Sequence, residues 1–433
     1  MRGLAPLSLL ALAALAVSCA QARTHTKAPA DAHAAAPVCH GSSGFAADFD
    51  GRRTFVWRPD WLSTIKSEFD SAARLAPARA ALLARAQSAL ARKTAYTVVD
   101  KTHLPASGDK HDYMSMGPYW WPDPQSKDGL PYIRRDGRFN PERDSEAFDV
   151  SDLGDMSQDV QALSLAYYFT GEKRYALKAG ELLRVWFIDP ATRMNPNFNH
   201  AQAIPGRVSG RAEGVIDAHR LSGVVESIGL LRTSSALSKR EHAALEHWFA
   251  ELVTWMDTSP IGIEERAARN NHGLYYDTLI SHFALFARMD AKAREVTNRA
   301  RALRLDTQIA ADGSLPLELT RTRSLHYVTW TLSAAFDLAA QGQCVGVDLW
   351  NHRGPQGQSL RAAVDFLLPY AGREDTWPYP ELDKTQTEEL MEVLRRAAWQ
   401  WHSPTYARGA ALYDSRNAKQ QINLLIPLPP SPK

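Results

Sequence analysis

Residues 155–188, DMSQDVQALSLAYYFTGEKRYALKAGELLRVWFI, carry the pattern that decides the fold. Apolar residues recur at helical spacing before and after a short turn centred on Gly171. The segment therefore predicts two helices joined as a hairpin. Because neither helix of such a hairpin can bury its apolar face alone, each hairpin needs neighbours of the same kind.

The same periodicity recurs along the chain, without a long alternating run of the kind that indicates a β-strand. A succession of helical hairpins closes most economically as an (α/α) toroid, and an open superhelix is the alternative. We expect an all-α fold, an (α/α) toroid built as an incomplete barrel of helical hairpins, in one domain over residues 45–425 with a tail at 426–433. The clearest helices are predicted over residues 77–92, 155–170, 173–188, 210–231, 239–257, 272–288, 291–305, 325–341, 358–370 and 385–401.

The composition is that of a globular soluble protein, with 45% hydrophobic and 23% charged residues. The formal net charge is only +2, so the chain lacks the global positive field that marks nucleic-acid binders, and no nucleic-acid partner is expected. Any positive charge that binds a polyanion must be local. No cluster of His, Asp and Glu has convincing ligand spacing, so we expect no metal and no other cofactor.

The first 22 residues are predicted to be a signal peptide. Arg2 supplies a basic start, the run from Leu9 to Val17 is apolar, and Ala20-Gln21-Ala22 fits a cleavage site. The apolar run is too short to span a bilayer, although Cys19 is a candidate for a lipid anchor. We therefore expect a periplasmic or secreted bacterial protein. Residues 23–44 predict a disordered tether.

Only Cys39 and Cys344 remain beyond the leader. Export permits them to form a disulfide. The sequence cannot place the two residues together, so two unpaired cysteines are the alternative.

Two long loops rich in polar and aromatic residues, 104–150 and 190–209, interrupt the helices. In a helical toroid such loops gather at one mouth and shape a cleft. The first loop contains Tyr119, Trp120 and Trp121 between prolines, in a segment too rich in proline for a helix. These rings are predicted to stack on sugar rings, with an aromatic plug of the toroid as the alternative.

Arg134 and Arg135 follow in the same loop, and their bidentate guanidinium groups suit carboxylates. Because acidic residues are interspersed, a solvated charged face is the alternative. In the second loop, Asn, Gln and His side chains approach a helix, where they can read hydroxyl and carboxylate groups. His200, Gln202 and Arg207 are the predicted substrate-binding residues of this loop, and helix capping is the alternative for such a junction.

The strongest local signal is Arg269-Asn270-Asn271-His272, at the entry to an amphipathic helix. A helix cap explains one Asn, but it does not explain two amides and an imidazole together. An adjacent amide and imidazole can donate hydrogen bonds to one carboxylate and withdraw charge from it. Downstream, Arg321 is expected one or two helical turns from Tyr327, where a guanidinium would lower the pKa of the phenol. A core tyrosine is the alternative for Tyr327 alone.

At these residues the chain resembles the alginate lyase family of (α/α)-toroid polysaccharide lyases, over roughly residues 100 to 345. The likeness rests on the aromatic segment at 117–124, on Asn270-Asn271-His272, and on residues 316–327. It implies Asn271, His272, Arg321 and Tyr327 as the active site. Tyr276, which follows the Asn-His motif, and His326, next to Tyr327, are further predicted substrate-binding residues. The interval from Arg to Tyr is one residue shorter than in the best-known mannuronate-specific members. The two long loops also resemble a divergent branch that includes glucuronan lyases, which leaves the substrate open.

The chemistry that this family implies is β-elimination from a 1,4-linked uronic-acid polymer, which leaves a C4–C5 double bond. Removing the C5 proton places negative charge on the uronate carboxylate, so the site must neutralise it; Asn271 and His272 suit that role. Tyr327 is the expected base for H5 and acid for O4, because in β-D-mannuronate and β-D-glucuronate both lie on one face of the ring. For α-L-guluronate they lie on opposite faces, and His272 would have to be the base.

Two other functions are compatible with the sequence. An inverting glycoside hydrolase uses the same fold but needs two opposed carboxylates, for which Glu213, Glu318 and Glu381 are candidates. A non-catalytic glycan-binding protein of the cell surface would keep the aromatic residues without turnover. In each case the expected partner is a polysaccharide.

Overall fold

The computed structural model of the protein describes residues 36–382 and 387–429, so the predicted signal peptide and Cys19 lie outside the described residues. The long helices are α2 (Ala76–Ala91), α3 (Val150–Thr170), α4 (Lys173–Leu183), α5 (Leu221–Leu231), α6 (Lys239–Thr258), α8 (Asn271–Phe286), α9 (Asp290–Ala300), α12 (Ser324–Cys344) and α14 (Thr387–Gln400). The short ones are α1 (Pro59–Glu68), α7 (Pro260–Ala267), α10 (Asp306–Gln308), α11 (Pro316–Leu319), α13 (Leu360–Leu367) and α15 (Pro404–Ala411). No described helix is both long and apolar enough to cross a membrane.

Every helix that the periodicity predicts is present, although some boundaries differ. The helix predicted over 210–231 is divided into a 3₁₀ segment, η5 (Ala212–Arg220), and α5. Helices α1, α7 and α15 were not predicted, and each of them begins with a proline. Proline favours the first position of a helix because its nitrogen has no proton to leave unbonded. These prolines, which are also typical of loops, therefore mark helix starts here.

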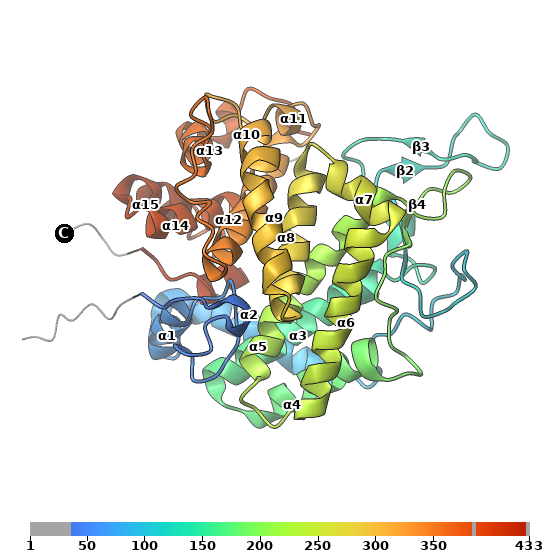
Figure 1. Cartoon of the computed structure of the whole chain (residues 1–433), viewed down its shortest axis with the longest axis horizontal. Coiled ribbons are helices and arrows are strands. Elements are labelled where there is room, and N and C mark those ends of the chain that lie inside the picture. Colours follow the sequence, from blue (N-terminus) through green and yellow to red (C-terminus); the bar gives the residue numbers. More distant parts are fainter. Residues whose placement is uncertain (1–35, 383–386, 430–433) are drawn as a thin grey trace, which may run out of the picture. The chain divides into compact units, whose positions relative to one another are not determined.

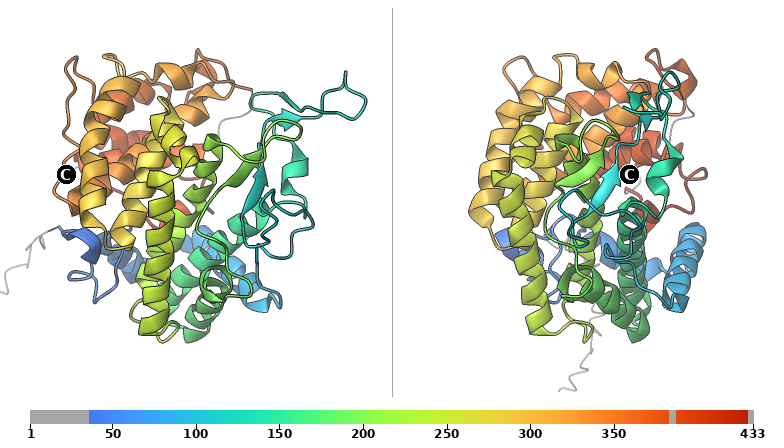
Figure 2. Two further views of the ribbon diagram at one scale, coloured as in Figure 1. Left: turned by 45° about the vertical axis from the view of Figure 1, so that its right-hand side comes forward. Right: turned by 90° about the vertical axis from the view of Figure 1, so that its right-hand side faces the viewer.

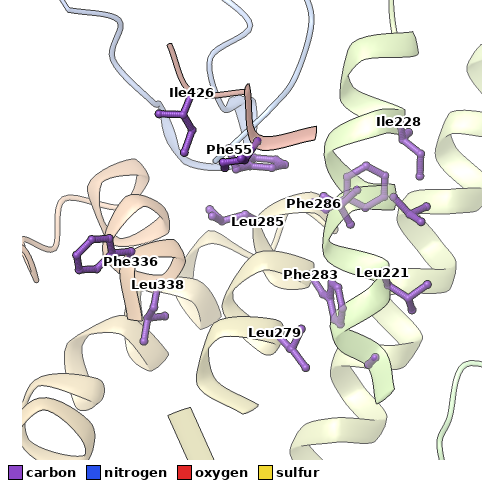
Figure 3. Packing of buried hydrophobic residues seen from close by; sticks show 14 of the residues in the cluster. Phe55, Leu221, Ile228, Leu279, Phe283, Leu285, Phe286, Phe336, Leu338 and Ile426 are labelled. Carbon is purple, nitrogen blue, oxygen red and sulfur yellow. The ribbon is translucent and has the colours of Figure 1, made fainter. Parts of the chain in front are cut away.

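Helical hairpins form the core of the molecule, as α3 packs on α4, α8 on α9 and α14 on α15 (Figure 1). Helix α8 lies among α6, α7 and α12. All of its residues are buried except His272, which is typical of a helix at the centre of a core. Figure 3 shows Leu279, Phe283 and Phe286 of α8 packed with side chains from neighbouring helices. The helix that begins at the Asn-His motif is thus held rigidly on all sides.

A capping box begins α6: the Ser238 hydroxyl accepts from the Glu241 backbone, and the Glu241 carboxylate accepts from the Ser238 backbone. Glu241 also accepts a hydrogen bond from Arg184. The bond to Arg184 is the main reason that the pKa of Glu241 falls to about 2.

Replacing Glu241 by Gln is expected to lower the free energy of unfolding at pH 7 by roughly 0.5–1 kcal/mol, the range of a partly exposed ion pair. Because folding lowers this pKa from 4.5, the stabilisation is present above pH 4.5 and is lost as the pH falls towards about 2. Urea unfolding of both proteins along this pH range measures the difference. If the difference in the free energy of unfolding between the two proteins stayed constant down to pH 3, the ion pair of Glu241 would not be its cause.

Residues 36–44 are described and include a short 3₁₀ helix at Gly41–Ser43, so the predicted tether of residues 23–44 is wrong at its C-terminal end. Cys39 is buried and forms a disulfide with Cys344 at the end of α12, with the two Cα atoms 4.5 Å apart. The Ser42 backbone donates to Asp290 at the start of α9. Sequence alone left the pairing open because 305 residues separate the two cysteines.

Replacing both Cys39 and Cys344 by Ser is expected to lower the free energy of unfolding by about 2–5 kcal/mol, because the disulfide restricts the unfolded chain. The activity at 25 °C should change little, since the bond lies at the end of α12 opposite Tyr327. Calorimetry of the oxidised wild type and the double variant measures the shift. Equal melting temperatures would contradict this prediction.

The two long loops fold against one another beside the helices (Figure 2). Strand β1 (Met114–Met116) pairs in parallel with β4 (His200–Ala203), and β2 (Trp120–Trp121) pairs antiparallel with β3 (Ile133–Arg134). The Met114 backbone exchanges hydrogen bonds with Asp149, immediately before α3. These short strands hold the aromatic and basic residues of the loops at one end of the helices, where the predicted site residues also lie.

Candidate active site

The first residue of α8, Asn271, is completely buried and bound to Glu318 of α11. The Asn271 backbone nitrogen donates to one Glu318 carboxylate oxygen at 2.8 Å, and its side-chain Nδ2 donates to the other at 2.7 Å. Burial raises the pKa of Glu318, and the two bonds from Asn271 oppose that shift. The amide oxygen of Asn271 has no hydrogen-bond partner within the described part of the chain. Glu318 thus sets the orientation of the amide.

His272 is held by a second buried carboxylate. Its Nδ1 lies 2.7 Å from Oε1 of Glu265 in α7, and Glu265 is only 2% exposed. The His272 side chain is 19% exposed. Burial raises the pKa of Glu265, while His272 lowers it. With Nδ1 bound to Glu265, Nε2 is the nitrogen that remains for a ligand.

Arg321 and Tyr327 are in contact, as the sequence predicts. The guanidinium carbon of Arg321 lies 3.7 Å from the centre of the Tyr327 ring. The hydroxyl of Tyr327 is 2.6 Å from the hydroxyl of Tyr119, which comes from the first long loop. The electrostatic field that acts on Glu318 includes both Arg321 and His272. Asn271, His272 and Arg321 therefore share the surroundings of one buried carboxylate, and Tyr327 is joined to this group through its contact with Arg321.

Burial and a second tyrosine outweigh the expected effect of Arg321 on the acidity of Tyr327. Burial raises the pKa of Tyr327, the neighbouring Tyr119 raises it further, and Arg321 lowers it only in part. The net shift is upwards, so the prediction of a lowered pKa is wrong. The sequence showed the guanidinium but not the burial, which disfavours the phenolate.

Asp136, which follows β3, links the first long loop to Arg321. Its carboxylate accepts from Arg321 at 3.0 Å, from Arg134 at 2.7 Å and from the hydroxyl of Thr322 at 3.0 Å. Burial alone would raise the pKa of Asp136, but the bonds to Arg321 and Thr322 and the charge of Arg134 lower it. Arg134 itself remains exposed. Asp136 was not predicted as a site residue, because arginines surround it in a segment that resembles a solvated face.

The second long loop contributes through Gln202 and Arg211. Gln202 is buried with a φ of 49°, a conformation that residues other than glycine adopt rarely. Its side-chain oxygen accepts from Arg211 at 2.8 Å, and its amide donates to Asp217 at 3.2 Å. Arg211 belongs to the electrostatic surroundings of Glu265. Gln202 is thus a buried bridge between Asp217 and Arg211, a cation that acts on the carboxylate bound to His272. Arg211 was not among the predicted site residues.

The predicted aromatic residues differ in their surroundings. Trp120 is half-buried, with the guanidinium of Arg207 5.4 Å and that of Arg211 6.0 Å from the ring centre. Trp121 lies beside exposed Arg135, at 5.5 Å. Tyr119, Trp120 and Trp121 therefore do not form a buried aromatic plug.

The predicted role of Tyr276 in substrate binding is wrong. Its ring is 1% exposed in the hydrophobic core, and its hydroxyl donates to the Met256 carbonyl. The neighbouring Tyr275 is also buried, but it belongs to a separate small cluster and packs on Trp330 of α12, with ring centres 4.0 Å apart. One residue is a rotation of about 100° around a helix, so the motif alone did not decide which tyrosine joins the main core.

His326 lies beside the site, and its Nδ1 is 3.0 Å from Glu389 while its ring stacks with Trp330. His200 has a different setting, because its Nε2 is 3.6 Å from Asp112. Asn195 and Asn197 donate to the same carboxylate. This polar cluster stabilises the second loop, and it does not include the four residues that the family resemblance implies.

The three carboxylates considered for a hydrolase are all engaged. Glu213 pairs with Arg211 at 2.9 Å, Glu318 binds Asn271, and Glu381 accepts from the Leu325 backbone at 2.9 Å. Glu318 is 2% exposed and bonded through both of its oxygens. It is therefore not arranged as a proton donor to a glycosidic oxygen.

Comparisons with known proteins agree with this geometry. The sequence model of the alginate lyase family matches residues 97–377. An alginate lyase from Bacteroides ovatus is 40% identical, and the match covers 86% of this chain and 99% of that chain with a TM-score of 0.82. A variant of alginate lyase A1-III in complex with a tetrasaccharide is 16% identical, with 81% and 94% covered and a TM-score of 0.50, a likeness of fold alone. No curated protein sequence matches.

The structural neighbours are (α/α) toroids, which confirms the predicted fold class. The family match covers more than half of the residues and includes Asn271, His272, Arg321 and Tyr327. The chain belongs to the alginate lyase family.

Proposed function

We propose that the protein is a polysaccharide lyase that cleaves 1,4-linked uronic-acid polymers by β-elimination. The observation that carries the proposal is the placement of Asn271, His272 and Arg321 near Glu318, with Tyr327 in contact with Arg321. Amide, imidazole and guanidinium donors suit a substrate carboxylate, and a phenol lies next to the guanidinium. Membership of the alginate lyase family supports the same reaction.

In the proposed reaction, Asn271 and His272 bind the carboxylate of the sugar whose C5 proton is removed. The electrons of the C5–H bond form the C4–C5 double bond, and the C4–O4 bond breaks. Negative charge grows on the carboxylate during this step, so donors that are already oriented lower the barrier. The hydrogen bonds from Asn271 to Glu318 and from His272 to Glu265 supply that orientation.

Tyr327 is the proposed base for H5 and acid for O4. The raised pKa of Tyr327 means that the phenol must release its proton to solvent before the reaction, and Arg321 over the ring is the group that favours the resulting phenolate. The phenolate then takes H5, and the phenol so formed donates that proton to O4. One residue can perform both transfers only when H5 and O4 lie on the same face of the sugar. The proposed substrates are therefore β-D-mannuronate and β-D-glucuronate polymers.

The proposed location is the periplasm or the outside of a bacterial cell. The disulfide between Cys39 and Cys344 supports it, because such bonds persist in oxidising compartments. Attachment of lipid at Cys19 stays a prediction. Mass spectrometry of the mature N-terminus from the native host distinguishes a processed Cys19 from cleavage after Ala22.

The test of function is incubation of the purified protein with polymannuronate, polyguluronate and glucuronan, followed by ultraviolet absorbance of the C4–C5 double bond. The proposed lyase produces this absorbance with polymannuronate or glucuronan. New reducing ends without absorbance would identify a hydrolase, and binding without either product would identify a glycan-binding protein. Absorbance with polyguluronate alone would contradict the assignment of both transfers to Tyr327.

A further inference from the structure

A buried carboxylate of α7 is built into the surroundings of His272. Glu265 is 2% exposed and lies 2.7 Å from Nδ1 of the histidine ring. Burying a carboxylate is costly unless a partner compensates for the lost water. In the proposed reaction Glu265 only orients the ring of His272. A neutral side chain could do the same, so the presence of a buried carboxylate there needs a further reason.

The contact between α7 and α8 is held by several other groups. Arg304, itself 3% exposed, donates to the carbonyls of Arg266 and Ala268 at the end of α7 and to Asp277 of α8. Gly273 follows His272, and a Cβ atom there would lie 2.0 Å from the Ala268 carbonyl oxygen. Only glycine therefore permits the end of α7 to come this close to the start of α8. Glu265 is positioned by a rigid network rather than by its own bond to His272.

The direction of the hydrogen bond follows from the chemistry of the two groups. An ionised carboxylate only accepts, so Nδ1 of His272 must carry a proton when Glu265 is ionised. A bond of 2.7 Å is typical of a charge-assisted pair. The other ring nitrogen, Nε2, makes no hydrogen bond to any described residue and is the nitrogen that can donate to a sugar carboxylate.

We propose that Glu265 is a positioning residue that acts through His272, holding its ring in the doubly protonated form with the Nε2 proton directed at the substrate carboxylate. The proposal rests on the proposed function. A neutral ring would have one proton for its two nitrogens, and Glu265 would hold that proton at Nδ1. The negative charge of Glu265 compensates for the second proton, and this keeps Nε2 a donor while the sugar carboxylate gains charge.

Most of the other charged groups around Glu265 and His272 have partners of their own. Glu318 of α11 contributes to the field at His272 and is bonded to Asn271. On the side of η5, Arg211 and Glu213 face Glu265 and pair with each other at 2.9 Å. On α6, Asp257 is paired with Arg266 and Lys292. On α8, Asp277 is paired with Arg299 and Arg304. Glu265 is thus the carboxylate in direct contact with the ring.

Glu265→Gln is the sharpest variant, because it keeps the shape and removes the charge. The expected result is a kcat that is about 10- to 100-fold lower. This is the range for replacing a residue that hydrogen-bonds to a metal-binding histidine. Removing the charge also narrows the pH range in which the ring holds both protons. The alkaline limb of the kcat profile should therefore move to lower pH by about one unit or more. Glu265→Asp keeps the charge, so its alkaline limb should stay near that of the wild type.

A matched control is Asp306→Asn, which alters a similar pair outside the site, where Asp306 lies 2.6 Å from Nε2 of His352. This variant should leave the pH profile unchanged. A profile that moves equally in both variants, or a Glu265→Gln protein that is merely less stable with an unchanged profile, would overturn the proposal.

Nitrogen-15 NMR of histidine-labelled protein provides a readout that does not require turnover, with His272→Gln to assign the signal. At neutral pH the wild-type ring should carry protons on both nitrogens, and the Glu265→Gln ring should carry one. A single proton on the wild-type ring would overturn the proposal even in an active lyase. If no polymer is cleaved, the proposed function fails, and the NMR result still decides whether Glu265 controls the ring.

Discussion

Replacing Tyr327 by Phe is expected to lower kcat/KM by at least about 1,000-fold, with little change in the binding of a uronate oligosaccharide. The variant keeps the ring beneath the Arg321 guanidinium and removes only the hydroxyl. General acid–base catalysis contributes typically 100- to 10,000-fold, and here one hydroxyl is assigned both transfers. Steady-state kinetics by ultraviolet absorbance and calorimetric titration of an oligosaccharide measure the two effects separately.

The matched control for this variant is Tyr276→Phe. Tyr276 lies in the core, and its hydroxyl donates to the Met256 carbonyl. Its loss should lower the free energy of unfolding by about 1 kcal/mol and leave kcat almost unchanged. Activity within threefold of wild type in Tyr327→Phe would refute the assignment of the proton transfers to Tyr327. A large loss of kcat in Tyr276→Phe would instead restore the prediction that Tyr276 acts on the substrate.

Replacing His272 by Ala is expected to lower kcat by about 100- to 1,000-fold, the effect of losing one donor that stabilises developing charge. The side chain is the only one of α8 that is not buried, so its removal should leave the packing of the helix intact. The charge of Glu265 then has no partner, which adds a second anion next to the sugar carboxylate. The KM should rise less than kcat falls, because the bond strengthens as the reaction proceeds.

His247→Ala is the control, since this histidine is exposed on α6 and pairs only weakly with Glu251. Its kinetics should equal those of the wild type. If His272→Ala raised KM and left kcat unchanged, His272 would bind the substrate equally in the ground state and the transition state. The role in charge neutralisation would then fall to Asn271 and Arg321.

The predicted helices and the catalytic motifs depend on short-range patterns. Apolar spacing identified α3, α4, α8 and α12, because the spacing of a buried helical stripe is a local property. Asn271 and His272 are adjacent, and Arg321 and Tyr327 lie within two turns. A resemblance to known motifs was therefore sufficient to select these residues. Helices α1, α7 and α15 are shorter and begin with proline, so their periodic signal was weaker than the loop signal.

The partners of these residues come from distant parts of the sequence. Glu318 lies 47 positions from Asn271, Asp136 lies 185 from Arg321, and Tyr119 lies 208 from Tyr327. Nothing local relates the members of such pairs. The places of Tyr275 and Tyr276 also depend on distant residues, because the packing of α8 against its neighbours decides that Tyr276 joins the main core and Tyr275 a separate small cluster.

By itself, the sequence determined the all-helical class, because periodicity is a property of neighbours in the chain. Through its resemblance to a known family it also selected the four residues proposed for the reaction. Only the tertiary structure decided that Glu265 and Glu318 are buried against His272 and Asn271 and that Cys39 pairs with Cys344. It also decided that the pKa of Tyr327 shifts upwards. Each of these depends on how much water is excluded and on which distant group replaces it. Both quantities arise when the helices pack together.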